Sequence, residues 1–305
     1  MTPAHERLEG RRAATLLGPV GLWSFEFDGL HAPEAEAAAQ AIERLGLRAL
    51  WIGEGSASKD ALAHAGLLLS FTESLVVCTG IANMWARDPV AARGGSSLLA
   101  DAYPGRFVLG LGVSHPESLP RRGHDFARPL ERARAYLDAM RTARYAGPEP
   151  AEPPPILLAA LGRRMLRLAA AETAGAHTYF VPVDHTAFAR ETLGTDPVLA
   201  VEAAVVLETD PTTAHEVARG HMRRYMRLRN YRENLLRHGF TEEDLEAGGS
   251  DSLTDALVAW GDPEAILERV RAHHEAGADH VAVQVLARNG GFPLDDITAV
   301  AAALL

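Results

Sequence analysis

The apolar and polar positions of this chain follow a repeated order: an amphipathic helix, a turn of small residues, and a short apolar strand. The order first occurs at residues 33–52, where Pro33 opens a predicted helix, Gly46 ends it, and residues 47–52 form a buried strand. It returns at residues 96–110, 163–181 and 262–286. Helices that alternate with buried strands predict parallel strands joined by right-handed crossover connections.

Additional apolar segments complete the predicted sheet. With the strands of the repeated order they give eight, at residues 20–25, 47–52, 75–81, 106–110, 156–160, 176–181, 198–207 and 280–286. Eight parallel strands with intervening helices in 305 residues favour a closed (β/α)8 TIM barrel over an open sheet. We therefore expect an α/β protein whose residues 1–305 form a single barrel domain.

One segment, residues 208–262, interrupts this rhythm before the last strand. Asp210 and Pro211 start a long basic helix that we expect to reach about Arg237, residues 241–244 look like a capping box, and residues 253–260 are a further apolar stretch. This is interpreted as a helical insertion. It either packs on the barrel or serves as a lid or dimer contact over the barrel mouth.

Composition excludes several classes of protein. The formal charge of −10 repels phosphate backbones, so no nucleic-acid partner is expected. Cys78 is the one cysteine, which excludes an internal disulfide framework and a multi-cysteine zinc site. The first residues lack the basic-then-apolar order of a signal peptide, and no apolar run is long enough to span a bilayer. We expect a cytoplasmic protein without a membrane partner.

The carboxyl ends of the predicted strands are where a parallel barrel places its active site. Ionisable residues are few there, which disfavours a hydrolytic site with converging carboxylates or imidazoles. Small residues allow a flat, bulky ligand to approach the backbone closely. The pattern therefore predicts a large planar cofactor beside the small residues Gly53, Gly55, Gly80, Gly110, Gly112, Ala159, Ala160 and Gly162.

Other catalytic motifs are missing from these positions. Gly110-x-Gly112 lacks the third glycine of a dinucleotide fingerprint, and Pro116 follows where a helix should open. Ser114 lies beside His115 but not in a nucleophile elbow. The sequence contains neither a Walker loop nor a His-Glu-x-x-His motif, and no metal site is expected.

Three motifs occur in order between the third and fourth predicted strands: TG-I-x-N at residues 79–83, R-D-P at 87–89, and GRF-x-LGLG at 105–112. Together with residues 158–165 and 276–281, they make the chain similar to the luciferase-like monooxygenase superfamily. The resemblance covers nearly the whole chain. It is strongest to the actinobacterial branch that depends on coenzyme F420, a 5-deazaflavin.

The resemblance implies a (β/α)8 barrel, usually a homodimer, with a flavin or deazaflavin at its mouth and a non-proline cis peptide bond at or beside Gly80–Ile81. The cofactor phosphate would be held by backbone amides at a helix start, a position suited to an anion, with Arg164 and Arg167 adding charge. The implied cofactor-binding residues are Thr79, Gly80, Ile81, Ala82, Asn83, Gly110 and Gly112 for the ring, and Ala160, Leu161, Gly162 and Arg163 for the phosphate.

Glu54 and His115 are the ionisable residues best placed at strand ends to act catalytically. A reduced deazaflavin delivers hydride, so the protein must supply orientation and a proton. The family often has Glu-His after the second strand, whereas this chain has Glu54-Gly55. Glu54 is therefore a candidate proton donor or a structural hydrogen-bond acceptor. His124 and His185 are further candidates.

These observations predict an oxidoreductase that transfers hydride between F420 and a small organic substrate. One alternative is an FMN-dependent monooxygenase that uses oxygen, because a reduced flavin reacts with oxygen whereas a reduced deazaflavin resists it. Another is a flavin-binding homologue without catalytic activity.

Overall fold

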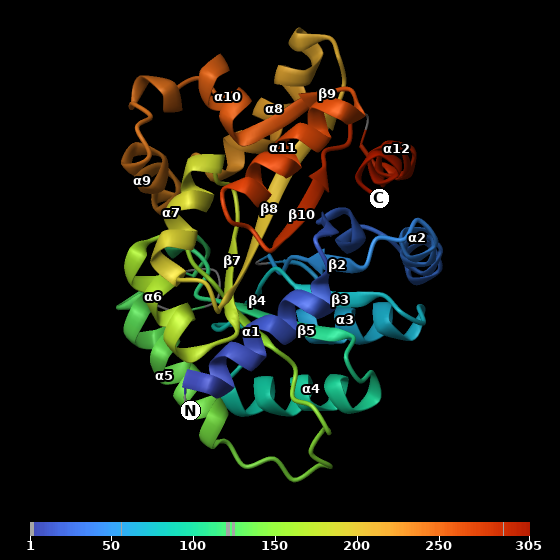
Figure 1. Ribbon diagram of the computed structural model, residues 1–305, viewed down its shortest axis with the longest axis vertical. Helices are drawn as coiled ribbons and strands as arrows, with labels where there is room; N and C mark the ends of the chain where they lie inside the picture. Colours follow the sequence, from blue (N-terminus) through green and yellow to red (C-terminus); the bar gives the residue numbers. More distant parts are fainter. Residues whose placement is uncertain (1–2, 56, 120–122, 124–125, 289) are drawn as a thin grey trace.

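Eight strands close into a parallel barrel in the computed structural model, which describes residues 3–55, 57–119, 123, 126–288 and 290–305 (Figure 1). The circle closes because β10 pairs with both β1 and β8. The (β/α)8 fold expected from the sequence is confirmed. The barrel strands are β1 (Val20–Ser24), β2 (Ala49–Ile52), β3 (Val76–Thr79), β5 (Phe107–Gly112), β6 (Ile156–Ala159), β7 (Gly175–Thr178), β8 (Val198–Leu207) and β10 (His280–Val285).

Alternate residues along each strand face opposite sides of the barrel wall. Leu22, Leu50 and Val77 belong to the large apolar cluster shared with the surrounding helices. Their neighbours Trp23 and Trp51 belong to a separate cluster inside the barrel. Both faces of the strands are therefore apolar, which explains why the strands read as continuous hydrophobic runs.

Helix α1 (Pro3–Leu17), which the sequence pattern did not predict, packs at the amino-terminal ends of the strands. Its Ala13 and Leu17 are fully buried in the interior cluster of the barrel. Gly10 allows close approach, because a Cβ there would lie 2.2 Å from the carbonyl oxygen of Asp196. A helix at this end leaves the opposite end, where the strands finish, for ligands.

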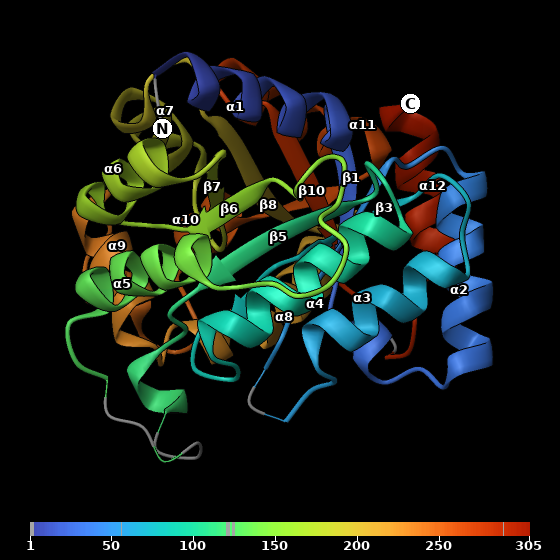
Figure 2. The same cartoon turned by 90° about the horizontal axis from the view of Figure 1, so that it is seen from below.

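The other helices surround the strands (Figure 2). Two of them begin with an aspartate N-cap that is followed by proline in the first turn, at Asp88 and Asp262. No described helix is long and apolar enough to cross a membrane. The helices that surround the strands are α2 (Ala32–Arg44), α3 (Ala61–Ser70), α4 (Pro89–Ala102), α5 (Pro129–Thr142), α6 (Arg163–Glu172), α7 (Val183–Leu193), α11 (Pro263–Glu275) and α12 (Leu294–Leu304).

The insertion before the last barrel strand differs from the sequence prediction in two respects. The expected single helix over residues 210–237 is wrong: the chain forms α8 (Pro211–Tyr225) and α9 (Arg229–Arg237), with Leu228 in an extended conformation between them. The break lets Tyr231 pack against Phe180 and Tyr225, so tertiary contacts override the helical pattern.

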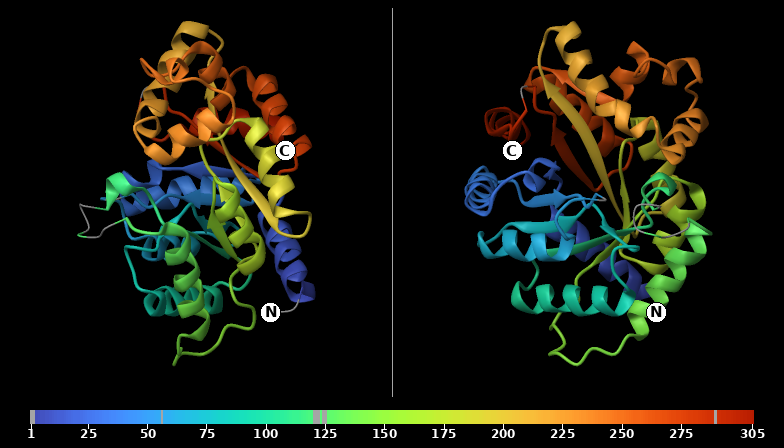
Figure 3. Two further views of the ribbon diagram at one scale, coloured as in Figure 1. Left: turned by 90° about the vertical axis from the view of Figure 1, so that its left-hand side faces the viewer. Right: turned by 180° about the vertical axis from the view of Figure 1, so that it is seen from behind.

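The apolar stretch at residues 253–260 is not wholly helical either. It divides into α10 (Asp251–Leu257) and β9 (Val258–Gly261), and β9 adds to the carboxyl-terminal half of β8. The capping box at residues 241–244 forms and leads into a single 3-10 turn, Glu243–Leu245. Figure 3 shows the insertion, in orange, gathered at one end of the molecule beside the segment that follows β5.

Candidate active site

A cavity of about 700 Å³ lies where the barrel strands end. Its walls come from the segments that follow β1, β2, β3, β5, β6 and β7, and from the insertion helices α8 and α9. This is the end of the barrel at which the sequence predicted a ligand. Among the described residues, no cluster of His, Cys, Asp or Glu side chains is arranged to hold a metal ion.

The residues predicted from the sequence divide into two groups. One group lines the cavity: Glu54, Gly80, Ile81, His115, Ala160, Leu161 and Gly162. Five others lie behind this lining and support it: Thr79, Ala82, Asn83, Gly110 and Gly112; Arg163 is exposed and does not line the cavity.

Gly110 and Gly112 provide clearance for protein atoms rather than for a ligand. A Cβ at Gly110 would lie 1.9 Å from the carbonyl oxygen of Thr79, whose hydroxyl donates a 2.7 Å hydrogen bond to the carbonyl oxygen of Gly110. A Cβ at Gly112 would meet the side chain of Ile81 at 2.8 Å. Both glycines thus allow the segment of residues 79–81 to lie directly on β5.

The peptide bond between Gly80 and Ile81 is cis, as the family resemblance predicted. The α-carbon of Gly80 faces two side chains inside the barrel. A Cβ there would lie 2.5 Å from Nε1 of Trp23 and 3.4 Å from Nε2 of His177. A larger residue at position 80 would therefore clash with Trp23 at the floor of the cavity.

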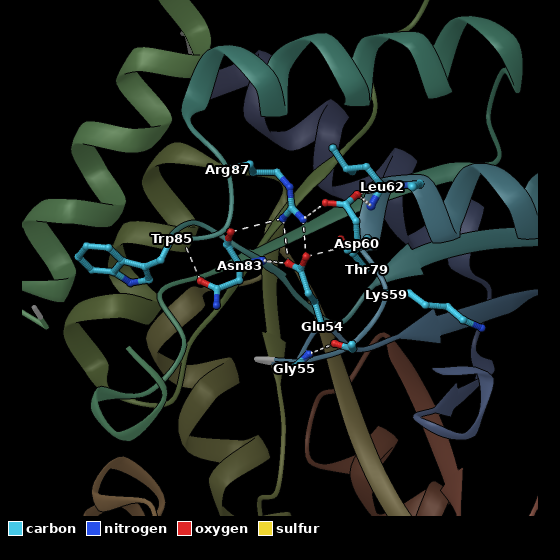
Figure 4. A network of polar contacts seen from close by, with 12 residues as sticks. Glu54, Gly55, Lys59, Asp60, Leu62, Thr79, Asn83, Trp85 and Arg87 are labelled. Atoms are coloured by element: carbon cyan, nitrogen blue, oxygen red, sulfur yellow. Dashed lines mark hydrogen bonds and ion pairs between the residues drawn. The ribbon is translucent and has the colours of Figure 1, made fainter. Parts of the chain in front are cut away.

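Glu54 lines the cavity, but its carboxylate is engaged on all sides (Figure 4). The side chain is 3% exposed and pairs with Arg87, whose Nη1 donates to Oε2 at 2.9 Å and whose Nη2 contacts Oε1. The backbone N–H of Asn83 donates to Oε2 at 2.7 Å, and that of Ala61 donates to Oε1 at 3.3 Å. This geometry favours the structural role for Glu54 and ties the segments after β2 and β3 together.

His115 follows β5 and lines the cavity next to the insertion helix α9. Its Nδ1 lies 2.9 Å from Oδ1 of Asn230 on α9, and its ring lies 5.3 Å from that of Tyr231. Burial lowers the pKa of His115 below its ordinary value, so the imidazole is neutral at pH 7. With Nδ1–H donated to Asn230, Nε2 is the ring atom that can accept a proton.

The remaining candidates lie away from the reacting region. His185 is fully buried behind the cavity, and its Nε2 lies 2.9 Å from the carbonyl oxygen of Leu161, which it helps to position. The guanidinium of Arg163 lies 4.9 Å from the centre of the Phe188 ring on α7, so only its backbone is near the cavity. His124 is outside the described residues.

The structure also reveals site residues that the sequence did not indicate. Trp23, His177 and Tyr179 line the cavity from β1 and β7. The Tyr179 hydroxyl donates to Gln284 at 2.8 Å and lies 2.7 Å from the Tyr225 hydroxyl. Each of these residues lies on or directly after an apolar strand, where a single aromatic residue is typical of core.

The insertion contributes positive charge to the cavity rim. Arg224 and Arg237 line the cavity, and neither has an ion-pair partner among the residues that the structure describes. Arg229 also lines it but pairs with Glu233 at 2.6 Å. The sequence left open whether the insertion packs on the barrel or covers its mouth. In the structure its strand β9 pairs with β8, its helices pack on these two strands, and α8 and α9 form one wall of the cavity.

The sequence profile of the luciferase-like monooxygenase family matches residues 23–280. A parallel barrel with a cofactor-sized cavity at its strand ends agrees with that match. The chain belongs to the luciferase-like monooxygenase family.

Several solved structures of the same fold are similar to this chain. One is an F420-dependent secondary alcohol dehydrogenase in complex with an F420-acetone adduct (TM-score 0.74, 16% identity, covering 94% of this chain and 99% of that one). A second is the coenzyme F420 dependent tetrahydromethanopterin reductase from Methanopyrus kandleri (0.71, 15%, 93% and 97%). A third is the oxygenating constituent of 3,6-diketocamphane monooxygenase from Pseudomonas putida in complex with FMN (0.68, 16%, 94% and 98%).

Proposed function

We propose that this protein is an oxidoreductase that transfers hydride between the deazaflavin coenzyme F420 and a small organic substrate. The observation that carries the proposal is the composition of one cavity: a floor beside Gly80, a helix start at Gly162, and arginines at the rim. When bound, the deazaflavin would supply or accept the hydride at its central ring. The two similar F420-dependent enzymes support the choice of coenzyme.

The cavity suits a planar ring. Two polar side-chain atoms at its floor, Nε1 of Trp23 and Nε2 of His177, are buried and have no protein hydrogen-bond partner among the described residues. Because buried polar atoms are nearly always satisfied in native proteins, a polar ligand at this floor is expected. The side chain of Ile81 and the ring of Phe25 offer apolar surface beside it.

The cavity also suits an anionic tail. Gly162 is the N-cap of α6 and makes no side-chain cap, and a Cβ on it would meet nothing within 4 Å. The first-turn N–H groups of a helix lack intrahelical partners and carry positive potential, so they bind phosphate. Arg237 lies at the same rim and would meet further negative charge, such as the glutamyl tail of F420.

His115 is the residue we assign to proton exchange. Its neutral ring accepts a proton at Nε2 when the substrate is an alcohol, and returns one when the substrate is a carbonyl. Asn230 fixes the ring orientation through Nδ1. Glu54 acts indirectly, by holding the segment of residues 80–83 that faces the cofactor.

The proposal is tested by titrating the purified protein with oxidised F420 and, separately, with FMN, following absorbance and fluorescence. We expect saturable micromolar or tighter binding of F420 and much weaker binding of FMN. A screen of secondary alcohols, ketones and enones would then identify turnover. Tight FMN binding with oxygen-dependent turnover would instead establish the flavin monooxygenase, and F420 binding without any turnover would establish a non-catalytic homologue.

A further inference from the structure

Two unsatisfied polar atoms meet at the floor of the cavity. Trp23 is 1% exposed and His177 is 2% exposed, yet both line the cavity. Nε1 of Trp23 and Nε2 of His177 both face Gly80: a Cβ built on that residue would lie 2.5 Å from the first atom and 3.4 Å from the second. Neither atom has a hydrogen-bond partner among the described residues. Both atoms are buried beside Gly80, so a ligand group that pairs with them must lie against Gly80 at the floor of the cavity.

The two atoms have opposite hydrogen-bonding roles. Indole Nε1–H can only donate. Nδ1 of His177 lies 3.2 Å from the carbonyl oxygen of Ala200, and because a carbonyl can only accept, Nδ1 carries the ring proton. Nε2 is consequently a bare acceptor. Burial lowers the pKa of His177 to about 3, which keeps the ring in this neutral form at pH 7.

Both side chains are held firmly in these orientations. The His177 ring stacks on Trp51 with ring centres 4.4 Å apart and planes 19° apart. Trp23 packs between Phe25 and Tyr179, with ring centres 4.4 Å and 5.0 Å away. Polar atoms fixed in this way discriminate strongly between ligands, because a ligand that cannot pair with them leaves them desolvated and unsatisfied.

We propose that Trp23 and His177 form a donor–acceptor pair that binds a ligand group in which an acceptor oxygen is accompanied by an N–H or O–H hydrogen. Trp23 donates to the oxygen, and the hydrogen is donated to Nε2 of His177. Two sources supply this chemistry: the imide edge of the cofactor ring, with a carbonyl beside N3–H, and the hydroxyl group of an alcohol substrate. The inference rests on the proposed function, since it needs a ring cofactor or its substrate in the cavity.

The test uses Trp23→Phe and His177→Phe, which keep an aromatic ring but remove the polar atom. Trp260→Phe is the matched control. It also removes an indole N–H, one that donates to Oδ1 of Asp255 at 2.7 Å, and Trp260 does not line the cavity. The probes are the oxidised F420 chromophore, FMN and the N3-methyl derivatives of both. Cyclohexanol and methoxycyclohexane serve as the alcohol pair. Dissociation constants are measured by fluorescence and by displacement, and circular dichroism confirms folding.

If the imide edge is the ligand, Trp23→Phe and His177→Phe each weaken ring binding about tenfold, the effect of one lost hydrogen bond in a dry site. N3-methylation then weakens binding to the wild type by a similar factor but not to His177→Phe. If the substrate hydroxyl is the ligand, ring binding is unchanged, and the preference of the wild type for cyclohexanol over methoxycyclohexane disappears in both variants.

The inference is overturned if both variants bind every probe as the wild type does, which would mean that the pair holds only water. It is also overturned if Trp260→Phe weakens binding as much as Trp23→Phe, because the effect would then come from a general loss of packing. If a variant fails to fold, the wild type alone still tests the pair. Methylation of the ring at N3, or of the hydroxyl group of cyclohexanol, must then weaken binding to the wild type. Failure of the proposed coenzyme is separate: binding of FMN but not F420 would refute the coenzyme, while N3-methyl-FMN would still test the pair.

Discussion

Substitution of Glu54 separates a structural role of this residue from a catalytic one. Replacing Glu54 with Gln keeps the shape of the side chain but removes its charge from a position that is 3% exposed and faces the buried guanidinium of Arg87. Breaking a buried ion pair from one side costs about 3–5 kcal/mol. Arg87 keeps a second partner, Asp60, at 2.7 Å, so we expect the lower end, about 3 kcal/mol off the free energy of unfolding.

Urea denaturation of the wild type and Glu54→Gln measures this loss. The control is Glu149→Gln, which removes the same charge from the exposed pair with Arg93 and should cost less than about 1 kcal/mol. Turnover of the folded Glu54→Gln protein should fall only a few-fold, because His115 exchanges the proton. Unchanged stability together with a loss of about a hundredfold or more in kcat would refute this reasoning and make Glu54 the proton donor.

Three further predictions follow from the same geometry. Gly162→Asp places a good N-cap residue on α6, where the backbone is extended and space is open. Stability should therefore hold or rise, while F420 binding weakens about tenfold through repulsion of the anionic tail; equal affinity in the titration would show that the tail binds elsewhere. His115→Gln should lower turnover about a hundredfold with F420 affinity unchanged. It should also remove the loss of rate that the wild type shows at acid pH, below 6.5, where the imidazole becomes protonated. Retained turnover and an unchanged pH profile would exclude His115 as the proton-exchanging group. Burial lowers the pKa of His177 and His273 to about 3 and that of His280 to about 4. Below pH 6.5 the unfolded chain therefore binds protons that the native protein does not, and stability should fall by about 1.4 kcal/mol per pH unit for each histidine until about pH 4. Burial raises the pKa of Glu202 to about 8, which opposes this trend with one group. A urea midpoint that stays constant or rises as the pH is lowered from 6.5 to 5 would contradict the prediction.

The barrel itself could be predicted from the sequence because its signals are local. Each strand is buried on both faces, so residues such as 47–52 and 198–207 read as apolar runs between helices that begin and end with clear capping residues. The split between α8 and α9 could not be predicted, since neither glycine nor proline marks it. It is produced by the packing of Tyr231 against residues distant in the sequence.

The candidate site could be predicted only in part, because many of its contacts join residues that are distant in the sequence. The position of a residue at a strand end indicated Glu54 and His115, but a single sequence does not show that Arg87 turns back onto Glu54 or that α9 brings Asn230 to His115. Trp23 and His177 were missed because an aromatic residue on a buried strand is usually core. What distinguishes them is a polar atom that has no partner among the described residues and lies beside the cavity, and this is visible only when all surrounding elements are in place.

The most direct test of the account is a crystal structure of the protein with F420 bound. We expect the ring to lie in the cavity against Gly80 and Ile81, with its phosphate at the start of α6 beside Gly162 and its glutamyl tail toward Arg237. Density for F420 at another surface, with side chains filling the space beside Gly80, would contradict the central claim that this cavity is the cofactor site.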